Sequence, residues 1–287
     1  MVHAWQPLIR AFDPHELLIH FIAPELGFYC ENGLQVTLRD LTFPPDKAPD
    51  PPFTAACGGA LMGWAKGIRR KVVFAATDFP MFWLHPRQEI KEVRGLIGRR
   101  VASYPAATPP EKFHRAILQK HGLDPERNVV FQAVRYDIAR FGLLKAGDVD
   151  AAVISLAIPP PTVQSAGSEK LLFFGDEIRV PTTGLAVSEE WAREQPETVR
   201  RLTGALYQGI VALRQSPEKV FSILARLLSE SPSIAEQTYN LVSNLFTRDG
   251  RASAEAVQNA VQFVNQQLSP ERRIRVNDVY DDSFLPV

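Results

Sequence analysis

The feature that most constrains the fold is the alternation of short, mostly apolar runs with helical patterns over the first two thirds of the chain. Short apolar runs are typical of buried strands, and helices between them favour a parallel sheet covered on both faces. The runs fall into two sets, which predicts two α/β lobes. The expected strands are residues 8–12, 36–41, 53–56 and 71–76 in the first set, and 99–103, 129–134 and 149–154 in the second.

The last third of the chain is predicted to be almost all helix. After a short strand at 184–187, Ser188 can cap one helix and Pro196 can open the next. That second helix carries one apolar stripe at helical spacing, which we expect to pack on the first lobe. The residues of the stripe are Val199, Leu202, Leu206, Ile210 and Leu213.

Charge and composition exclude several classes of protein. The 32 basic residues are balanced by 32 acidic ones, and zero net charge argues against a nucleic-acid partner. No apolar run is long enough to predict a membrane span. The start of the chain lacks the pattern of a secretion signal, so the protein is expected either in the cytoplasm or outside it with its signal removed.

Cys30 and Cys57 match no metal motif and are expected as buried thiols, with a disulfide as the alternative.

The sequence contains no motif that predicts a catalytic centre, a metal site or a cofactor. His15 and Glu16 form a candidate acid/base pair, but adjacent side chains usually diverge, so a binding or capping role is favoured. Asp78 follows an apolar strand and is interpreted either as a base or as a cap. His85, His114 and His121 lie in polar surroundings and are expected at the surface.

Small and polar residues follow several of the predicted strands. In open α/β sheets, ligands bind beyond the carboxyl ends of strands, so these positions predict a binding site. Helices that begin at Gly58-Gly59 and at Thr108 would also present backbone N–H groups to an anion. The alternative is that they are ordinary turn residues. The candidate residues are Phe12, Asp13, His15 and Glu16 after the first strand; Cys57, Gly58 and Gly59; Thr77 and Asp78; Tyr104, Ala107 and Thr108; and Ser155.

Five segments together resemble the solute-binding proteins of ABC importers, of the nitrate, sulfonate and thiamine-precursor type (NMT1/THI5-like). Each segment is a loose match, and their order and spacing carry the resemblance. They are Ala23–Tyr29 with Glu31–Val36, Leu96–Ala102, Leu144–Ala151, Thr183–Ser188 with Trp191 and Pro196-Glu197, and Val279–Asp281 with Phe284-Leu285.

The resemblance implies a two-lobed periplasmic-binding-protein type II fold of the α/β class, with the helix-rich last third packed on lobe 1. Lobe 1 would comprise residues 1–88 and 181–287, and lobe 2 residues 89–180, with a ligand cleft between them. It adds Thr182 and Thr183 to the ligand-binding residues. It also implies a monomer that passes its small-molecule ligand to the membrane permease subunits of an importer outside the cytoplasm.

The leading hypothesis is therefore a binding protein, not an enzyme, for a small anionic or aromatic solute. The alternative is a cytoplasmic enzyme on the same scaffold, decarboxylase-like or of thiamine-precursor synthesis, with His15, Glu16 and Asp78 as acid/base groups. One enzyme branch of the family uses a cysteine-rich iron motif. This chain has only Cys57 in the comparable loop, which argues against that activity.

The run Phe79–Trp83 is expected in the core, with stacking on a ligand ring as its alternative. A ligand-sensing regulatory module is disfavoured because no DNA-binding helix pair is evident.

Overall fold

The structure is a computed structural model that describes residues 14–37 and 52–286, with backbone alone for residues 14–17. The chain divides into two compact units. Unit 1 comprises Met1–Asp78 and Val180–Val287, and unit 2 is the continuous segment Phe79–Arg179. The division falls at 78/79, ten residues before the expected 88/89 boundary, because the strand at 82–86 pairs within the sheet of unit 2. The second division, at 179/180, is one residue from the expected 180/181.

The described sheet of unit 1 is antiparallel. Its strands are β1 (Phe53–Ala56), β2 (Arg70–Thr77) and β8 (Thr183–Ser188), and β8 lies in the middle with an antiparallel neighbour on each side. The prediction of a parallel sheet was wrong for these strands. Their apolar character follows from burial, since β2 and β8 are almost wholly inaccessible to water. The strands expected at 8–12 and, for the most part, at 36–41 lie outside the described residues.

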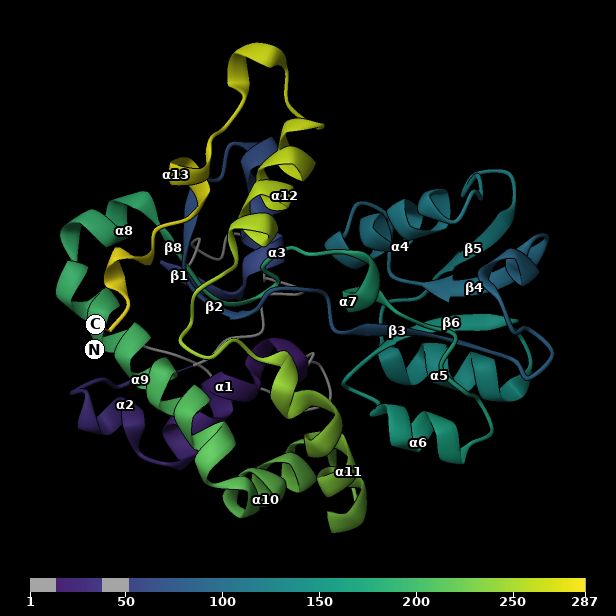
Figure 1. Cartoon of the computed structure of the whole chain (residues 1–287), viewed down its shortest axis with the longest axis horizontal. Helices are drawn as coiled ribbons and strands as arrows, with labels where there is room; N and C mark the ends of the chain where they lie inside the picture. The colour runs from purple at the N-terminus through teal and green to yellow at the C-terminus, as the bar shows by residue number, and fades with distance from the viewer. Residues whose placement is uncertain (1–13, 38–51, 287) are drawn as a thin grey trace. The chain divides into compact units, whose positions relative to one another are not determined.

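Helices cover the sheet of unit 1. The predicted apolar stripe of α9 is confirmed, because its five residues are completely buried, and α9 packs along α1 (Figure 1). Ser188 caps α8 through the N–H of Trp191, and Pro196 opens α9, both as predicted. The helices are α1 (Pro14–Glu25), α2 (Phe28–Glu31), α3 (Cys57–Gly63), α8 (Glu189–Glu194), α9 (Pro196–Gln215), α10 (Pro217–Leu228), α11 (Pro232–Val242), α12 (Ala254–Asn265) and α13 (Val276–Val279).

Unit 2 is built on a five-stranded sheet in the order β5-β4-β6-β3-β7. The predicted parallel arrangement is confirmed for β4 (Arg99–Ser103), which lies between β5 (Val129–Ala133) and β6 (Ala151–Ser155). Strands β3 (Phe82–Pro86) and β7 (Leu172–Phe173) were not predicted, and both pair antiparallel. The helices of the unit are α4 (Pro109–Lys120), α5 (Asp137–Ala146), α6 (Pro160–Ser165) and α7 (Phe174–Glu177).

The aromatic run that leads into β3 is core, as predicted. Phe82 and Trp83 are each 2% exposed, and the Trp83 ring stacks on Phe173 at 5.1 Å between centroids. Cys57 is a buried free thiol as expected, whereas Cys30 is exposed and free, which corrects the prediction of two buried thiols.

Gly184 fixes the approach of β8 to β2. Its φ is +143°, and a Cβ added there would lie 2.0 Å from the carbonyl oxygen of Phe74 and 2.8 Å from the backbone nitrogen of Ala76. A side chain would therefore separate the two strands at the centre of the sheet, since backbone atoms cannot give way as the end of a flexible side chain can.

We expect Gly184→Ala to lower the free energy of unfolding by about 3–5 kcal/mol, from backbone strain and overpacking together. Urea unfolding followed by circular dichroism measures the change. Gly142→Ala is the matched control, because Gly142 is exposed within α5 and no atom lies within 4 Å of its added Cβ; it should stabilise the protein by about 0.5–1 kcal/mol. Equal effects of the two substitutions would contradict the argument.

Candidate functional site

Three threonines meet at one end of the unit 1 sheet. The Thr77 hydroxyl, at the end of β2, shares hydrogen bonds with the hydroxyls of Thr182 at 3.0 Å and Thr183 at 2.8 Å. All three side chains are buried. We call Thr77, Thr182 and Thr183 the threonine cluster. Because each hydroxyl both donates and accepts, the cluster can reorient its hydrogen bonds toward a polar group placed beside it.

The start of α3 lies against this cluster. The N–H of Gly58 donates to the carbonyl oxygen of Thr182 at 3.1 Å. The Cys57 thiol is completely buried, 3.9 Å from the carbonyl oxygen of Phe74. The predicted proximity of Cys57, Gly58 and Gly59 to the strand ends is thus present. The N–H of Gly58 is already engaged within the protein, however, which weakens the idea that this helix start holds an anion.

Asp78 caps a distant helix. Its Oδ2 accepts the N–H of Ser253 at 2.9 Å, and Ser253 is the residue before α12. Its Oδ1 is buried and has no hydrogen-bond partner among the described residues. One carboxylate oxygen of Asp78 therefore has a structural role, and the other is available to a polar ligand.

A buried histidine supports the backbone next to the threonine cluster, and sequence reasoning missed it. His20 Nε2 lies 2.6 Å from the carbonyl oxygen of Gly184, and His20 Nδ1 lies 2.9 Å from the Tyr29 hydroxyl. Burial lowers the pKa of His20 to about 4 and raises the pKa of Tyr29. His20 is therefore a neutral bridge from α1 to β8. Its place within the otherwise apolar stretch 17–23 was the available signal.

In unit 2, the carboxylate of Asp137 accepts hydrogen bonds from groups at the ends of two strands. Asp137 Oδ1 accepts the backbone N–H of Ser155 at 2.7 Å, and Asp137 Oδ2 accepts the Tyr104 hydroxyl at 3.2 Å. Tyr104 follows β4 and Ser155 ends β6, so two of the predicted site residues converge on one side chain. We call Tyr104, Asp137, Arg140 and Ser155 the carboxylate cluster.

Arg140 is the completely buried cation of this cluster. It forms an ion pair with Asp137 at 2.6 Å, and it donates to the carbonyl oxygens of Val153 and Val134 at 2.6 and 2.7 Å. Its guanidinium also lies 3.6 Å from the centre of the Tyr104 ring. Neither Asp137 nor Arg140 was among the residues predicted for the site. An acidic residue and an arginine three positions apart, just after a strand, are the pattern that would have indicated them.

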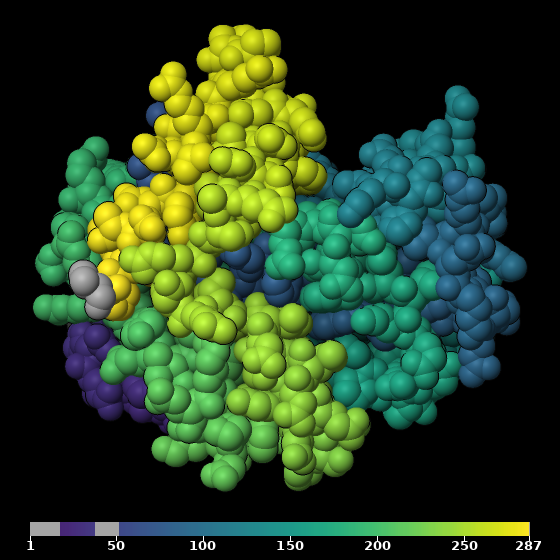
Figure 2. All heavy atoms as spheres, in the orientation of Figure 1, coloured from purple at the N-terminus to yellow at the C-terminus, as the bar shows by residue number. Residues whose placement is uncertain are grey.

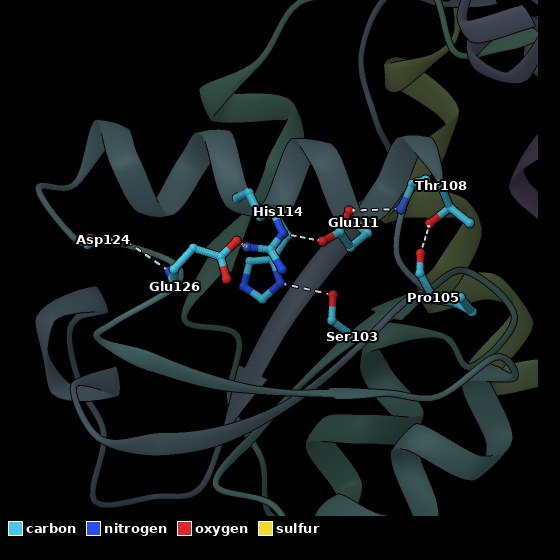
Figure 3. A network of polar contacts seen from close by, with 9 residues as sticks. Ser103, Pro105, Thr108, Glu111, His114, Asp124 and Glu126 are labelled. Atoms are coloured by element: carbon cyan, nitrogen blue, oxygen red, sulfur yellow. Dashed lines mark hydrogen bonds and ion pairs between the residues drawn. The ribbon is translucent and has the colours of Figure 1, made fainter. Parts of the chain in front are cut away.

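The turn before α4 is held by its own side chains (Figure 3). Ala107 has φ +65°, and its N–H donates to Glu111 Oε2 at 3.3 Å, while the Thr108 hydroxyl donates to the carbonyl oxygen of Pro105 at 2.7 Å. The first two helical residues, Pro109 and Pro110, carry no N–H. Glu111 and the prolines therefore leave little of the predicted anion-binding character at this helix start.

The prediction that His85 and His114 lie at the surface was wrong. His114 is completely buried, and its Nδ1 lies 3.0 Å from the Ser103 hydroxyl (Figure 3); His85 is 1% exposed within β3. Burial lowers the pKa of His85 to about 4 and that of His114 to about 3. His121 is part-exposed at the end of α4 and contacts the Glu177 carboxylate at 3.1 Å.

The structure describes no side chain for four of the predicted site residues. Phe12 and Asp13 lie outside the described residues, and His15 and Glu16 are placed only by the backbone of α1. Within the described ranges, no three His, Cys, Asp or Glu side chains gather as a metal site would require. No helix in those ranges is both long and apolar enough to cross a membrane.

A family model described as "NMT1/THI5 like" matches residues 16–220. The chain belongs to the NMT1/THI5-like family. The match runs from α1 through β8 and α9 to the first turn of α10, so it includes both clusters. Among proteins with curated descriptions, none matches this NMT1/THI5-like chain significantly.

Solved structures show the fold of this NMT1/THI5-like protein. The alkanesulfonate-binding protein SsuA from Xanthomonas axonopodis pv. citri, bound to MOPS, superposes with a TM-score of 0.72 at 16% identity, covering 93% of this chain and 96% of its own. A Candida albicans protein with the generic periplasmic binding protein fold gives 0.69 at 12% identity, covering 95% of both chains. The chain therefore has the periplasmic binding protein fold.

An enzyme shares that fold. The desulfurization enzyme DSZB superposes on this NMT1/THI5-like chain with a TM-score of 0.70 at 17% identity, covering 93% of this chain and 94% of its own. The fold by itself therefore does not separate binding from catalysis, and the function must be argued from the residues.

We expect Asp137→Ala to destabilise the protein by about 3–5 kcal/mol, because it leaves the buried Arg140 guanidinium without its counter-charge. Glu197→Ala is the control: it removes an ion pair with Arg200 in which both side chains are at least half exposed, and it should cost less than about 1 kcal/mol. Urea unfolding measures both. A small loss for Asp137→Ala would mean that Arg140 is held by the carbonyl oxygens alone.

Stability should fall as the pH is lowered from about 7 to about 4. His20, His85 and His114 have folded pKa values below the ordinary 6.5 because they are buried, so the unfolded chain binds protons in this window that the folded chain does not. Each contributes on the order of 3 kcal/mol at pH 7, lost progressively as the pH falls. Urea unfolding at stepped pH measures the slope. The double variant His20→Gln/His114→Gln should have a shallower slope, and an unchanged slope would contradict the assignment.

Proposed function

We propose that this protein binds a small anionic or aromatic solute as the substrate-binding component of an ABC-type importer. Family membership and the periplasmic binding protein fold support a solute-binding role. The observation that carries the proposal is that each unit gathers polar side chains at the ends of its strands. These are the threonine cluster in unit 1 and the carboxylate cluster in unit 2. Such positions are where open α/β folds bind ligands.

Of the two solute classes, the geometry favours an aromatic solute with hydrogen-bond donors. The N–H groups of Gly58 and Ser155 already have acceptors within the protein, so they are not free for an anion. Asp78 and Asp137 add negative charge at the strand ends of their units, and Arg140, the cation paired with Asp137, is buried. Carboxylates accept hydrogen bonds from N–H and O–H donors and repel an anion, while the threonine hydroxyls can serve a solute as donors or as acceptors.

The proposal assigns the solute to both clusters, as the two-lobed family fold implies. The permease subunits of the importer as partners, the monomeric state and a location outside the cytoplasm belong to the same proposal. They rest on the family and on importer-type proteins such as the alkanesulfonate-binding SsuA. Of the other candidate ligand residues, Asp78 adjoins Thr77 and Ala107 and Thr108 closely follow Tyr104 in sequence, while Cys57–Gly59 are linked to the threonine cluster by the hydrogen bond from Gly58 to Thr182.

A second candidate is an enzyme on this scaffold, favoured by the fold shared with DSZB and by the buried, unpartnered Oδ1 of Asp78. Asp78 would then act with His15 and Glu16 as acid/base groups. Turnover of a bound compound that disappears in His15→Ala, with binding retained, would favour the enzyme over the binding protein.

Thermal shift and calorimetry with nitrate, ethanesulfonate, benzoate and 4-aminopyrimidine test the proposal, because a ligand that binds only the folded state raises Tm. We expect 4-aminopyrimidine to give the largest shift. The variant Thr77→Val/Thr183→Val, which removes two hydroxyls at nearly constant volume, should weaken that binding on the order of ten-fold or more, as expected for lost hydrogen bonds in a buried site.

Thr238→Val is the matched control. Thr238 is also completely buried in unit 1, but its hydroxyl donates within α11 to the carbonyl oxygen of Ile234. This variant should bind like the original protein. Equal weakening in both variants would show that lost stability, not a lost ligand contact, explains the result. A larger shift with nitrate or ethanesulfonate would overturn the preference for an aromatic solute.

A further inference from the structure

Unit 1 carries a strongly basic surface that the proposed function does not use. Its exposed cations are Lys66, Arg69, Arg272, Arg273 and Arg275, and we call these five residues the cationic tip. They come from two turns far apart in sequence: the turn after the short 3-10 helix Trp64–Lys66, and the segment that joins α12 to α13.

A backbone bridge on one side and a side-chain contact on the other bring the two turns together. Val72 near the start of β2 bridges Tyr280 in parallel, and the N–H of Asp281 donates to the carbonyl oxygen of Val72 at 3.0 Å. α13, just before Tyr280, therefore packs beside the start of β2. At the other side, the Gln267 amide contacts the Met62 sulfur at 3.5 Å. Figure 1 shows the α12–α13 segment beside the turn that precedes β2, and in Figure 2 dark blue atoms emerge beside the yellow ones.

The local charge is far from that of the whole chain. Segments 62–71 and 266–278 contain seven Lys and Arg residues against two acidic ones, an excess of five positive charges in a protein of zero net charge. The two acids are engaged locally. Glu271 accepts the Ser269 hydroxyl, which lowers the pKa of the Glu271 carboxyl, and Asp278 accepts the N–H of Arg275 at 2.7 Å. The rest of the chain carries the balancing excess of five negative charges, and Asp281 and Asp282, which closely follow the second segment, are among its acidic residues.

Apolar side chains lie among the cations. Ile68 is 39% exposed and Val276 is 36% exposed. Trp64 anchors the first turn, because its Nε1 donates to the carbonyl oxygen of Arg70 at 2.9 Å and the Arg69 guanidinium lies 6.0 Å from its ring centre. Two exposed aliphatic side chains are therefore sequence neighbours of cations of the tip, Ile68 beside Arg69 and Val276 beside Arg275.

We propose that the cationic tip docks on the surface of an anionic phospholipid bilayer. Basic side chains bind anionic headgroups without a shaped groove, and aliphatic side chains among them can enter the interface. A nucleic acid would use the arginines but would offer no apolar layer to Ile68 and Val276. Each basic residue near such a surface strengthens binding on the order of five-fold, so attachment is expected to be reversible and weakened by salt.

Vesicle flotation with the whole protein tests the proposal. We expect it to float with phosphatidylcholine vesicles that contain roughly one third phosphatidylglycerol at about 50 mM salt, and not with pure phosphatidylcholine vesicles. The variant Arg272→Gln/Arg273→Gln/Arg275→Gln should bind on the order of a hundred-fold more weakly, and Ile68→Ser should also weaken binding. Circular dichroism and Tm verify that each variant is folded.

Lys91→Gln/Arg127→Gln/Lys145→Gln is the matched control, because it removes three exposed cations from unit 2. It should bind the anionic vesicles like the original protein. Equal loss in this control would show that overall charge, not the cationic tip, drives attachment and would overturn the proposal. Equal flotation with neutral vesicles would overturn it too. Retention on heparin or on an acidic peptide without flotation would replace the bilayer with an acidic macromolecule.

Discussion

The return of the chain as β8 is the constraint on which unit 1 depends. β8 lies between β1 and β2 and supplies the central strand of the described sheet. Its close approach to β2 requires a residue without a side chain at 184. The same strand carries Thr183 to Thr77 and offers the carbonyl oxygen of Gly184 to His20. The sheet, the threonine cluster and the buried histidine therefore all depend on one strand.

Unit 2 is organised around a buried cation, Arg140. Arg140 is enclosed, paired with Asp137, and hydrogen-bonded to the carbonyl oxygens of Val153 within β6 and of Val134 just after β5. A buried ion pair contributes little net stability, but it permits few alternative arrangements of the groups around it. Tyr104 and Ser155 are fixed by the same carboxylate. The strand ends of this unit are therefore held in place by the cluster to which we propose that the solute binds.

The sequence predicted elements better than their pairing. Local signals were sufficient for the apolar stripe of α9, the caps at Ser188 and Pro196, and the parallel core around β4, because each depends on near neighbours in the chain. The antiparallel setting of β8 depends on partners more than 100 residues away, and an apolar run looks alike in either direction. β3 was missed because its aromatic residues give no alternation when both faces are buried.

Among the residues of the two clusters, Thr77, Tyr104 and Ser155 were proposed from the sequence because each lies at or just after the end of a predicted strand. His20 and Arg140 were not, since burial of a polar side chain is decided by contacts distant in sequence.

The discontinuity of unit 1 has a consequence for biosynthesis. All of unit 2, Phe79–Arg179, emerges from the ribosome before β8 is made. During that interval β1 and β2 exist without the strand that joins them, and each presents unpaired backbone groups of the kind that other chains can pair with. Unit 2 is continuous, and every strand of its own sheet has been made before β8 begins. The newly made chain thus carries one lobe that is able to fold early and one whose sheet stays incomplete for about a hundred further residues, which makes unit 1 the part most exposed to misassembly during translation.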